Sequence, residues 1–208
     1  MSPPWRWRQG WLSHPDVDQL ESLNCDDRPA DIAVSLIVIH AISLPPEQFH
    51  GNAVSDFFMN RLDCSAHPFF TQIHDLKVSA HFFIRRTGQV IQFVSVDKRA
   101  WHAGVSSWHG RERCNDFSVG IELEGSDSRP FTSKQYQCLV HLISAVRQHY
   151  PIRHIAGHCD IAPGRKTDPG PCFDWTCLRR LLGVMGDLLP NYDTKGIDIN
   201  VADSSDFS

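Results

Sequence analysis

The segment from Gly157 to Gly170 carries three side chains that could act together in hydrolysis. An imidazole (His158), an ammonium group (Lys166) and a carboxylate (Asp168) lie within eleven residues of the chain. Two Pro-Gly pairs rule out one continuous helix or strand here, so we expect a shaped loop. Because ordered loops on a rigid scaffold often carry catalytic groups, we predict that this loop forms half of a zinc hydrolase site.

A hydrolytic zinc site needs further groups from elsewhere in the chain. Zinc enzymes commonly use three protein ligands, histidines with a carboxylate or thiolate, and leave the fourth position for water. They also need a carboxylate to transfer the proton and a cation or donor to hold the developing oxyanion. The sequence allows His40, His158 and Asp168 as the ligands, Glu122 as the acid/base and Lys166 as the oxyanion holder.

Spacing alone leaves other ligand sets open. His154 and His158 lie on one face of a predicted strand, and Cys159 beside them could supply a thiolate. His154 is the weaker alternative, because Gly157 and Pro151 disfavour the helical turn that would bring it to the metal.

Two predicted strands would carry the remaining groups. Residues 32–39 are apolar and rich in β-branched side chains on both alternations, which indicates a central strand covered on both faces, ending at His40. Open sheets place their ligands at such strand ends. Ser118–Gly125 is another strand, whose period-two alternation puts Glu122 on the face opposite Val119. That face points either into a cleft or to solvent.

The other elements follow from periodicity and end signals. Residues 24–29 indicate a turn, and residues 81–94 a hairpin with its turn at 85–88. Residues 52–62 allow a helix, and residues 152–157 a short strand. A long helix begins at Thr132, whose capping box uses Gln135, and ends before Pro151. Asp174 caps a last helix with Trp175, Leu178, Leu181, Leu182, Met185 and Leu188 facing the core.

Composition indicates one ordinary globular domain. The 208 residues are 41% hydrophobic and 21% charged, and the net charge is −4, so there is no basic surface typical of nucleic-acid binding. Seven cysteines without regular spacing favour reduced thiols in a cytoplasmic protein. The N-terminus lacks the apolar core of a secretory signal, and no apolar run is long enough to span a membrane.

We predict three parts along the chain. Residues 1–21 form an N-terminal segment whose tryptophans dock it on the core, although tryptophans interleaved with Arg6 and Arg8 could also form a membrane or nucleic-acid arm. Residues 22–190 form the zinc-dependent catalytic domain. Residues 191–208, with four aspartates against one lysine, form an acidic tail that we expect to be disordered.

Several motifs resemble those of a known enzyme family. Val38–His40 followed by Ile42–Pro46 looks like the first metal-ligand motif of bacterial N-acetylmuramoyl-L-alanine amidases of the AmpD type. The agreement continues over Ser79–Phe82, Trp101–Gly104, Gly110–Ser118, Gly120–Gly125 and the loop from Gly157. It covers about residues 22–185, and the run from Gly110 to Gly125 together with that loop is highly specific.

The resemblance implies an α/β fold, with a mixed central sheet flanked by helices, that is shared with peptidoglycan recognition proteins. It also implies that His40, His158 and Asp168 bind one zinc ion and that Glu122 and Lys166 are the catalytic pair. The same comparison makes Trp101, His102 and Arg113 candidates for holding the sugar and the acidic peptide, because an Arg fork suits a carboxylate. From pattern alone, Trp101 and His102 could equally be a packed aromatic and a surface imidazole.

The implied reaction is hydrolysis of the amide between anhydro-N-acetylmuramic acid and L-alanine, on muropeptides recycled in the cytoplasm by a monomeric enzyme. Two positions depart from the family: Ala41 replaces the usual Asn after the first ligand, and Cys159 replaces the frequent Ser after the second. Both leave rate and substrate preference open. A muropeptide-binding module without activity and a zinc peptidase that cuts within the stem peptide are the alternatives.

Overall fold

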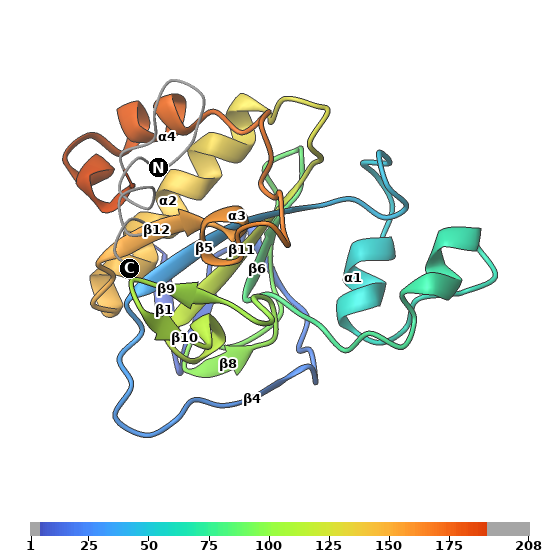
Figure 1. Ribbon diagram of the computed structural model, residues 1–208, viewed down its shortest axis with the longest axis horizontal. Helices are drawn as coiled ribbons and strands as arrows, with labels where there is room; N and C mark the ends of the chain where they lie inside the picture. Colours follow the sequence, from blue (N-terminus) through green and yellow to red (C-terminus); the bar gives the residue numbers. More distant parts are fainter. Residues whose placement is uncertain (1–4, 191–208) are drawn as a thin grey trace, which may run out of the picture.

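A six-stranded mixed sheet forms the centre of the computed structural model, which describes residues 5–190 (Figure 1). The spatial order is β12-β5-β11-β6-β7-β3. Strands β12, β5, β11 and β6 are parallel to one another, β7 is antiparallel to β6, and β3 is parallel to β7. The bounds are β3 Val17–Gln19, β5 Leu36–Ile42, β6 Phe82–Ile84, β7 Val90–Gln92, β11 Ser118–Glu124 and β12 His154–Gly157. The expected mixed sheet and the hairpin at residues 81–94 are confirmed.

Helices α2 (Ser133–His149) and α4 (Trp175–Leu182) cover one face of this sheet (Figure 1). Alternate residues of β5 and β11, such as Ile37 and Ile121, lie in one buried cluster with Leu139 of α2 and Leu178 of α4. The capping box that the sequence predicts at Thr132 is present. This apolar layer fixes the sheet, so residues on the opposite face of the same strands are held in a rigid frame.

The opposite face of the sheet packs against a second group of residues. Leu36 and Val38 of β5 pack there in a second cluster with Trp108 and Cys114. Since side chains alternate along a strand, His40 projects to the same face. Strand β5 begins and ends later than the predicted 32–39 and runs two residues past His40, because its register with β11 continues to Ile42.

The region from residue 47 to 80 contains little regular structure. Helix α1 (Ala53–Phe58) is shorter than the predicted 52–62, and a 3-10 helix η1 (Pro68–Gln72) follows. Figure 1 shows both helices extending away from the side of the sheet. Phe57, Phe58 and Phe70 pack in a separate cluster with Phe83 of β6 and Phe93, which attaches this region to the sheet.

The N-terminal segment docks on the core, as the tryptophans indicated. Strands β1 (Arg6–Arg8) and β2 (Trp11–Ser13) form a hairpin, and β3 then becomes the edge strand of the central sheet. Trp7 packs against the main cluster and its indole Nε1 donates to the Ala145 carbonyl of α2 at 3.2 Å. The predicted boundary at residues 21 and 22 stays a prediction, and the predicted tail lies outside the described residues.

The turn predicted at residues 24–29 is wrong. Cys25–Asp27 is strand β4, which pairs with β8 (Lys98–Ala100). Asp26 and Asp27 lie opposite Arg99 and Lys98 and form ion pairs with them across the strands. These partners are more than seventy residues away in sequence, so local turn propensity gave no sign of them.

The remaining elements lie on the face of the sheet that carries His40 and at the C-terminal end of the described residues. Strands β9 (Ser107–Trp108) and β10 (Arg111–Glu112) form a short hairpin, followed by a 3-10 helix η2 (Cys114–Asp116). Helix α3 (His158–Ile161) opens the segment that we predicted to be entirely loop. Within residues 5–190, no helix is long and apolar enough to cross a membrane.

The predicted last helix is interrupted. Helix α4 ends at Gly183, whose φ of +57° is left-handed, and a 3-10 helix η3 (Gly183–Leu188) continues the chain. Trp175, Leu178 and Leu182 are buried as expected, but Leu181 is exposed. Met185 and Leu188, which follow the interruption, are partly buried and pack against the main cluster as expected, so of the six named residues Leu181 alone departs from the predicted apolar face.

Candidate active site

Three side chains meet on the face of the sheet opposite helices α2 and α4. Nδ1 of His40 lies 3.0 Å from Nδ1 of His158 and 3.1 Å from Oδ2 of Asp168, and the last two atoms are 3.0 Å apart. In the part of the chain that the structure describes, this is the group of three or more His, Cys, Asp or Glu side chains placed to hold a metal ion. The structure thus brings together the three ligands named from the sequence.

Neighbouring elements place each of the three residues. His40 lies in β5, and His158 directly follows β12, which is the strand paired with β5 on its other side. Asp168 returns to them because the N–H of Cys159 donates to its carbonyl at 2.9 Å. The parallel register and this one backbone contact close the loop around the site.

Burial and mutual contact set the charges of the group. Burial lowers the pKa of His40 to about 4, against the opposing contact with Asp168. Burial acts to raise the pKa of Asp168, but hydrogen bonds and charge from His158 and His40 outweigh it and hold that pKa well below its usual range. Above mildly acidic pH, His40 is therefore neutral and Asp168 ionised, which are the protonation states of metal ligands.

The donor set fits a zinc ion. Zinc held at about 2.0–2.1 Å by tetrahedral N and O ligands separates those ligand atoms by about 3.3 Å. The observed separations of 3.0–3.1 Å are close to this value. The second nitrogen of each ring is already engaged, by His102 for His40 and by the Ala103 carbonyl for His158, so both Nδ1 atoms face inward.

Glu122 lies beside the group on the adjacent strand. Its Cα is the register partner of His40 in the β11–β5 pair, and its side chain is buried with Oε2 lacking a hydrogen-bond partner. Burial and the charge of Asp168 raise the pKa of Glu122 well above its usual value, while Lys166 opposes the shift. A carboxyl group that accepts and returns a proton needs this raised pKa.

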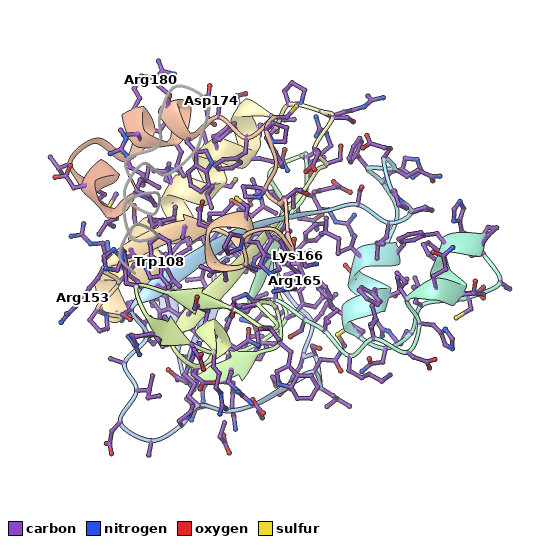
Figure 2. All side chains as sticks on the ribbon, viewed as in Figure 1. Trp108, Arg153, Arg165, Lys166, Asp174 and Arg180 are labelled. Carbon is purple, nitrogen blue, oxygen red and sulfur yellow. The ribbon has the colours of Figure 1, made fainter. Side chains whose placement is uncertain are left out.

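Lys166 is exposed and comes from the loop between α3 and Asp168 (Figure 2). Its charge acts to lower the pKa of both Glu122 and His40, so its ammonium group lies within electrostatic range of both side chains. The backbone N–H groups of Arg165 and Lys166 both donate to the Ala162 carbonyl at 3.1 Å, which gives the loop a defined turn.

The three residues expected to hold substrate are placed differently from one another. Trp101 is half-buried after β8, and its side chain contacts Asp26. Arg113 has a left-handed backbone (φ +60°) and an exposed side chain that pairs with Asp116 at 3.2 Å. His102 is buried and hydrogen-bonded to His40, so it is not the surface imidazole that its pattern allowed.

The alternative ligands do not join the group. His154 lies exposed on β12, where its ring packs against that of His109 with centroids 5.1 Å apart. The Cys159 thiol is directed to Asp160, and burial raises its pKa to about 12, so it remains protonated at neutral pH. Neither His154 nor Cys159 therefore joins His40, His158 and Asp168 as a ligand of the candidate metal site.

Sequence reasoning missed the residues that brace this site. Asn115, Ser118 and Gly120 hold His102 and Ala103 in place, and Arg165 donates to the Ala103 carbonyl at 2.8 Å. The only signal for them was their presence in the specific run from Gly110 to Gly125 and in the segment after Gly157.

The geometry defines a hydrolase site on a mixed α/β sheet, and sequence comparison gives the family. The profile of the family described as N-acetylmuramoyl-L-alanine amidase matches residues 30–171. The chain belongs to this family. The enzyme class that the motifs indicated, an amide hydrolase of the AmpD type, is therefore confirmed.

Individual relatives agree over most of the chain. The 1,6-anhydro-N-acetylmuramyl-L-alanine amidase AmpD of Escherichia coli is 52% identical over 176 residues, which are 84% of this chain and 95% of that protein. A crystal structure of a selenomethionine AmpD derivative is similar with a TM-score of 0.81 and 51% identity, over 84% of this chain and 98% of that one. E. coli AmiD in complex with anhydro-N-acetylmuramic acid-L-Ala-D-gamma-Glu-L-Lys gives a TM-score of 0.52 and 31% identity, over 74% and 60%.

Proposed function

We propose that this protein uses one zinc ion to hydrolyse the amide between anhydro-N-acetylmuramic acid and the L-alanine of muropeptides. The observation that carries the proposal is the buried, unpartnered carboxyl of Glu122 beside a group of three metal ligands. The names and substrates of relatives that are about half identical, together with the substrate complex of AmiD, support the choice of bond.

His40, His158 and Asp168 would hold the zinc ion. Zinc bound there would supply a Lewis acid for the scissile carbonyl and lower the pKa of a bound water towards neutrality. With two neutral imidazoles and one carboxylate, the three ligands leave one positive charge on the metal, which favours both effects. Their own contacts to His102 and the Ala103 carbonyl hold the rings in orientation.

Glu122 would carry the proton in this reaction. In its ionised form the carboxylate takes a proton from the attacking water, and in its neutral form it returns that proton to the nitrogen of the leaving L-alanine. The raised pKa suits both halves, since it makes the carboxylate a stronger base and keeps the proton available.

Lys166 would stabilise the oxyanion of the tetrahedral intermediate. A preorganised cation near developing negative charge contributes most in a partly water-excluded site.

Trp101 and Arg113 remain proposed contacts for the sugar and for the peptide carboxylate. We also propose that the enzyme is a monomer and that it acts in cytoplasmic recycling. The seven free cysteines, all of which lie in described residues, support the cytoplasmic location.

The test is product analysis with anhydro-muramyl-tripeptide, using zinc-loaded protein with and without chelator. We expect free anhydro-muramic acid and intact tripeptide, identified by mass, only when metal is present. Absence of cleavage by protein shown to hold zinc would contradict the amidase proposal, and cleavage inside the tripeptide would indicate a peptidase instead. Unchanged cleavage by metal-free protein would contradict the role of zinc alone.

A further inference from the structure

The two ligand histidines are oriented by two consecutive residues of one loop. Nε2 of His40 lies 2.9 Å from Nδ1 of His102, and Nε2 of His158 lies 3.1 Å from the carbonyl oxygen of Ala103. Metal-binding histidines usually direct their second ring nitrogen to a carboxylate, a carbonyl or water. His40 instead has an imidazole as its partner, which is less common. This contact requires Nδ1 of His102 to be the nitrogen without a proton.

The hydrogen-bond chain requires one tautomer of His102. If Nδ1 of His40 faces the metal, its Nε2 carries the proton and donates to Nδ1 of His102. A neutral His102 then carries its own proton on Nε2, which donates to the Ser118 hydroxyl at 3.2 Å. Both ring nitrogens are used in this way, and the side chain is buried, so none is left to bind the substrate.

Gly120 makes room for this ring. A Cβ on Gly120 would lie 2.5 Å from Cγ of His102 and 2.7 Å from its Nδ1, much closer than real Cβ contacts. The imidazole therefore rests directly on the backbone of β11, two residues before Glu122 on the same face. A glycine at this position is needed for the ring to approach His40 at all.

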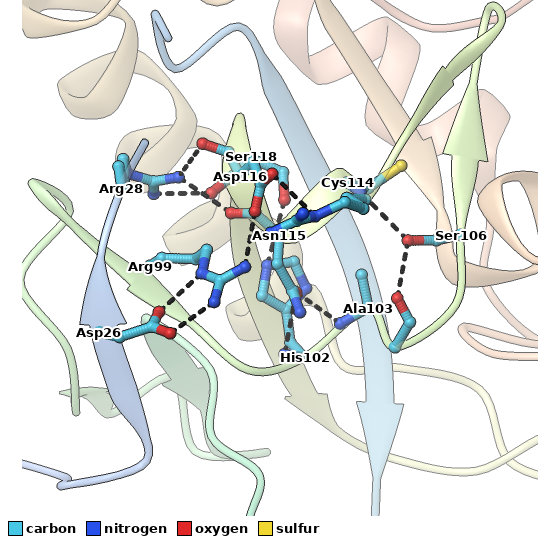
Figure 3. A network of polar contacts seen from close by, with 12 residues as sticks. Asp26, Arg28, Arg99, His102, Ala103, Ser106, Cys114, Asn115, Asp116 and Ser118 are labelled. Carbon is cyan, nitrogen blue, oxygen red and sulfur yellow. Dashed lines mark hydrogen bonds and ion pairs between the residues drawn. The ribbon is translucent and has the colours of Figure 1, made fainter. Parts of the chain in front are cut away.

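Asn115 fixes the loop from its backbone side. Its Oδ1 accepts from the N–H of His102 at 3.2 Å and from the N–H of Ala103 at 2.8 Å (Figure 3). Arg28 in turn donates to the carbonyls of Asn115 and Ser118 at 3.0 and 2.8 Å. Figure 3 shows these residues forming one continuous network behind the loop.

We propose that His102 is a positioning residue for the metal ligand His40 and not a contact for the substrate. It accepts the Nε2 proton of His40, while Ser118 fixes its tautomer and Gly120 admits its ring. This inference rests on the zinc site of the proposed function but concerns metal binding, so it is tested without substrate. Loss of such an orienting partner typically lowers metal affinity by about 10- to 100-fold.

The test compares two amide variants of the full-length protein, His102→Asn and His102→Gln. The asparagine oxygen falls near the position of Nδ1 and can still accept from His40, whereas the glutamine amide falls near the position of Nε2. The readouts are the zinc dissociation constant by competition with a chromophoric chelator, the visible spectrum of the Co²⁺-substituted protein, and KM and kcat at saturating zinc. His154→Leu, which removes an exposed histidine at the opposite end of β12 from His158, is the control.

We expect zinc affinity to fall about 10- to 100-fold in His102→Gln and to remain within about threefold of wild type in His102→Asn and His154→Leu. The Co²⁺ spectrum should change in His102→Gln alone. Equal, wild-type zinc affinity in both His102 variants, with KM raised, would overturn the proposal and make His102 a substrate contact. If one variant does not fold, Ser118→Ala provides a second comparison, and unchanged zinc affinity and Co²⁺ spectrum there would also overturn it.

These outcomes are distinct from failure of the proposed function. Wild-type protein that does not bind zinc would contradict the zinc site itself. Wild-type protein that binds zinc but does not cleave the muropeptide would contradict the reaction and leave the role of His102 to be decided by the affinities.

Discussion

At the scale of single residues, Glu122 and Glu124 show how position on one strand separates two identical side chains. Both are buried on the same face of β11. Glu124 accepts the backbone N–H of Arg86 at 2.9 Å, whereas Oε2 of Glu122 has no partner. The carboxylate of Glu124 is therefore satisfied within the protein, whereas Glu122 keeps one oxygen free for the proton transfer that we propose.

This difference predicts the effect of replacing each carboxyl group. Glu122→Gln should keep wild-type zinc content but lose turnover by about two to four orders of magnitude, because the amide cannot take up the proton. Glu124→Gln is the matched control, since its amide oxygen can still accept from Arg86, and should retain turnover within a few-fold. Metal analysis and steady-state kinetics on both variants measure this, and equal losses would contradict the acid/base role.

Lys166 gives a second prediction at this scale. Replacing it with methionine, which keeps the length but removes the charge, should lower kcat by about a hundredfold if the ammonium meets the oxyanion. Lys134, an exposed lysine at the start of α2, provides the control substitution and should leave kcat unchanged. A Lys166→Met protein with wild-type kcat and a raised KM would assign the lysine to substrate binding.

At the scale of elements, local sequence predicted those parts whose signals are local. The hairpin at 81–94, strand β11 and helix α2 follow from periodicity and caps. The two strand ends that we named as ligand positions lie at the candidate metal site. Strand β4 and the role of His102 were not predictable in this way. Both depend on partners more than sixty residues away, Arg99 for Asp26 and His40 for His102, and sequence alone gives no distance between them.

Gln135 shows how one predicted local feature also has a long-range function. Gln135 occupies the N3 position of the helix in this capping box, where its side-chain oxygen accepts from the N–H of Thr132 at 3.0 Å. Its Nε2 also donates to the carbonyls of Ile84 and Glu124, at 3.2 and 3.0 Å, and its side chain is fully buried. The start of α2 is thereby tied to the ends of β6 and of β11, the strand that carries Glu122.

Substitutions of Thr132 and Gln135 should therefore lower the free energy of unfolding by different amounts. Thr132→Ala should lower the free energy of unfolding by about 1–2 kcal/mol, because the helix loses its cap and the Arg86 carbonyl loses the Thr132 hydroxyl, its donor at 2.8 Å. Gln135→Ala should cost more, about 2–4 kcal/mol, because two buried carbonyls also lose their donor. Ser133→Ala, an exposed neighbour, is the control. Urea unfolding followed by circular dichroism measures all three, and equal costs for Thr132→Ala and Gln135→Ala would show that the ties to the sheet contribute nothing.

At the scale of the whole molecule, buried polar groups join elements that lie far apart in the sequence. Gln92 of β7 donates to the Gly10 carbonyl at 2.8 Å and accepts from the N–H of Leu12 at 2.7 Å. Arg28 and His81 lie between β4, β8 and β11, and the N–H of Gly120 donates to Nδ1 of His81 at 3.0 Å. Protonation of a buried group such as His81 therefore affects the stability of the whole fold.

His81 sets the direction of the pH dependence. Burial, followed by the charge of Arg28, lowers its pKa well below the usual value, with a contact to the Lys98 carbonyl opposing. The unfolded chain takes up a proton at about pH 6.5, whereas the folded protein does not until much lower pH. Between these values the unfolded state binds more protons, so stability falls as pH falls. Burial of His40 acts in the same direction down to its pKa of about 4.

We therefore expect the free energy of unfolding of zinc-free protein to be nearly constant from pH 8 to pH 7 and to fall below about pH 6.5. Each buried neutral histidine contributes a slope of about 1.4 kcal/mol per pH unit there. His81→Asn keeps an acceptor for the Gly120 N–H but removes one titrating group. It should be less stable at pH 8 and have a slope smaller by about 1.4 kcal/mol per unit between pH 6 and 5. Urea unfolding at half-unit pH intervals measures both quantities, and an unchanged slope in His81→Asn would mean that His81 is protonated in the folded protein.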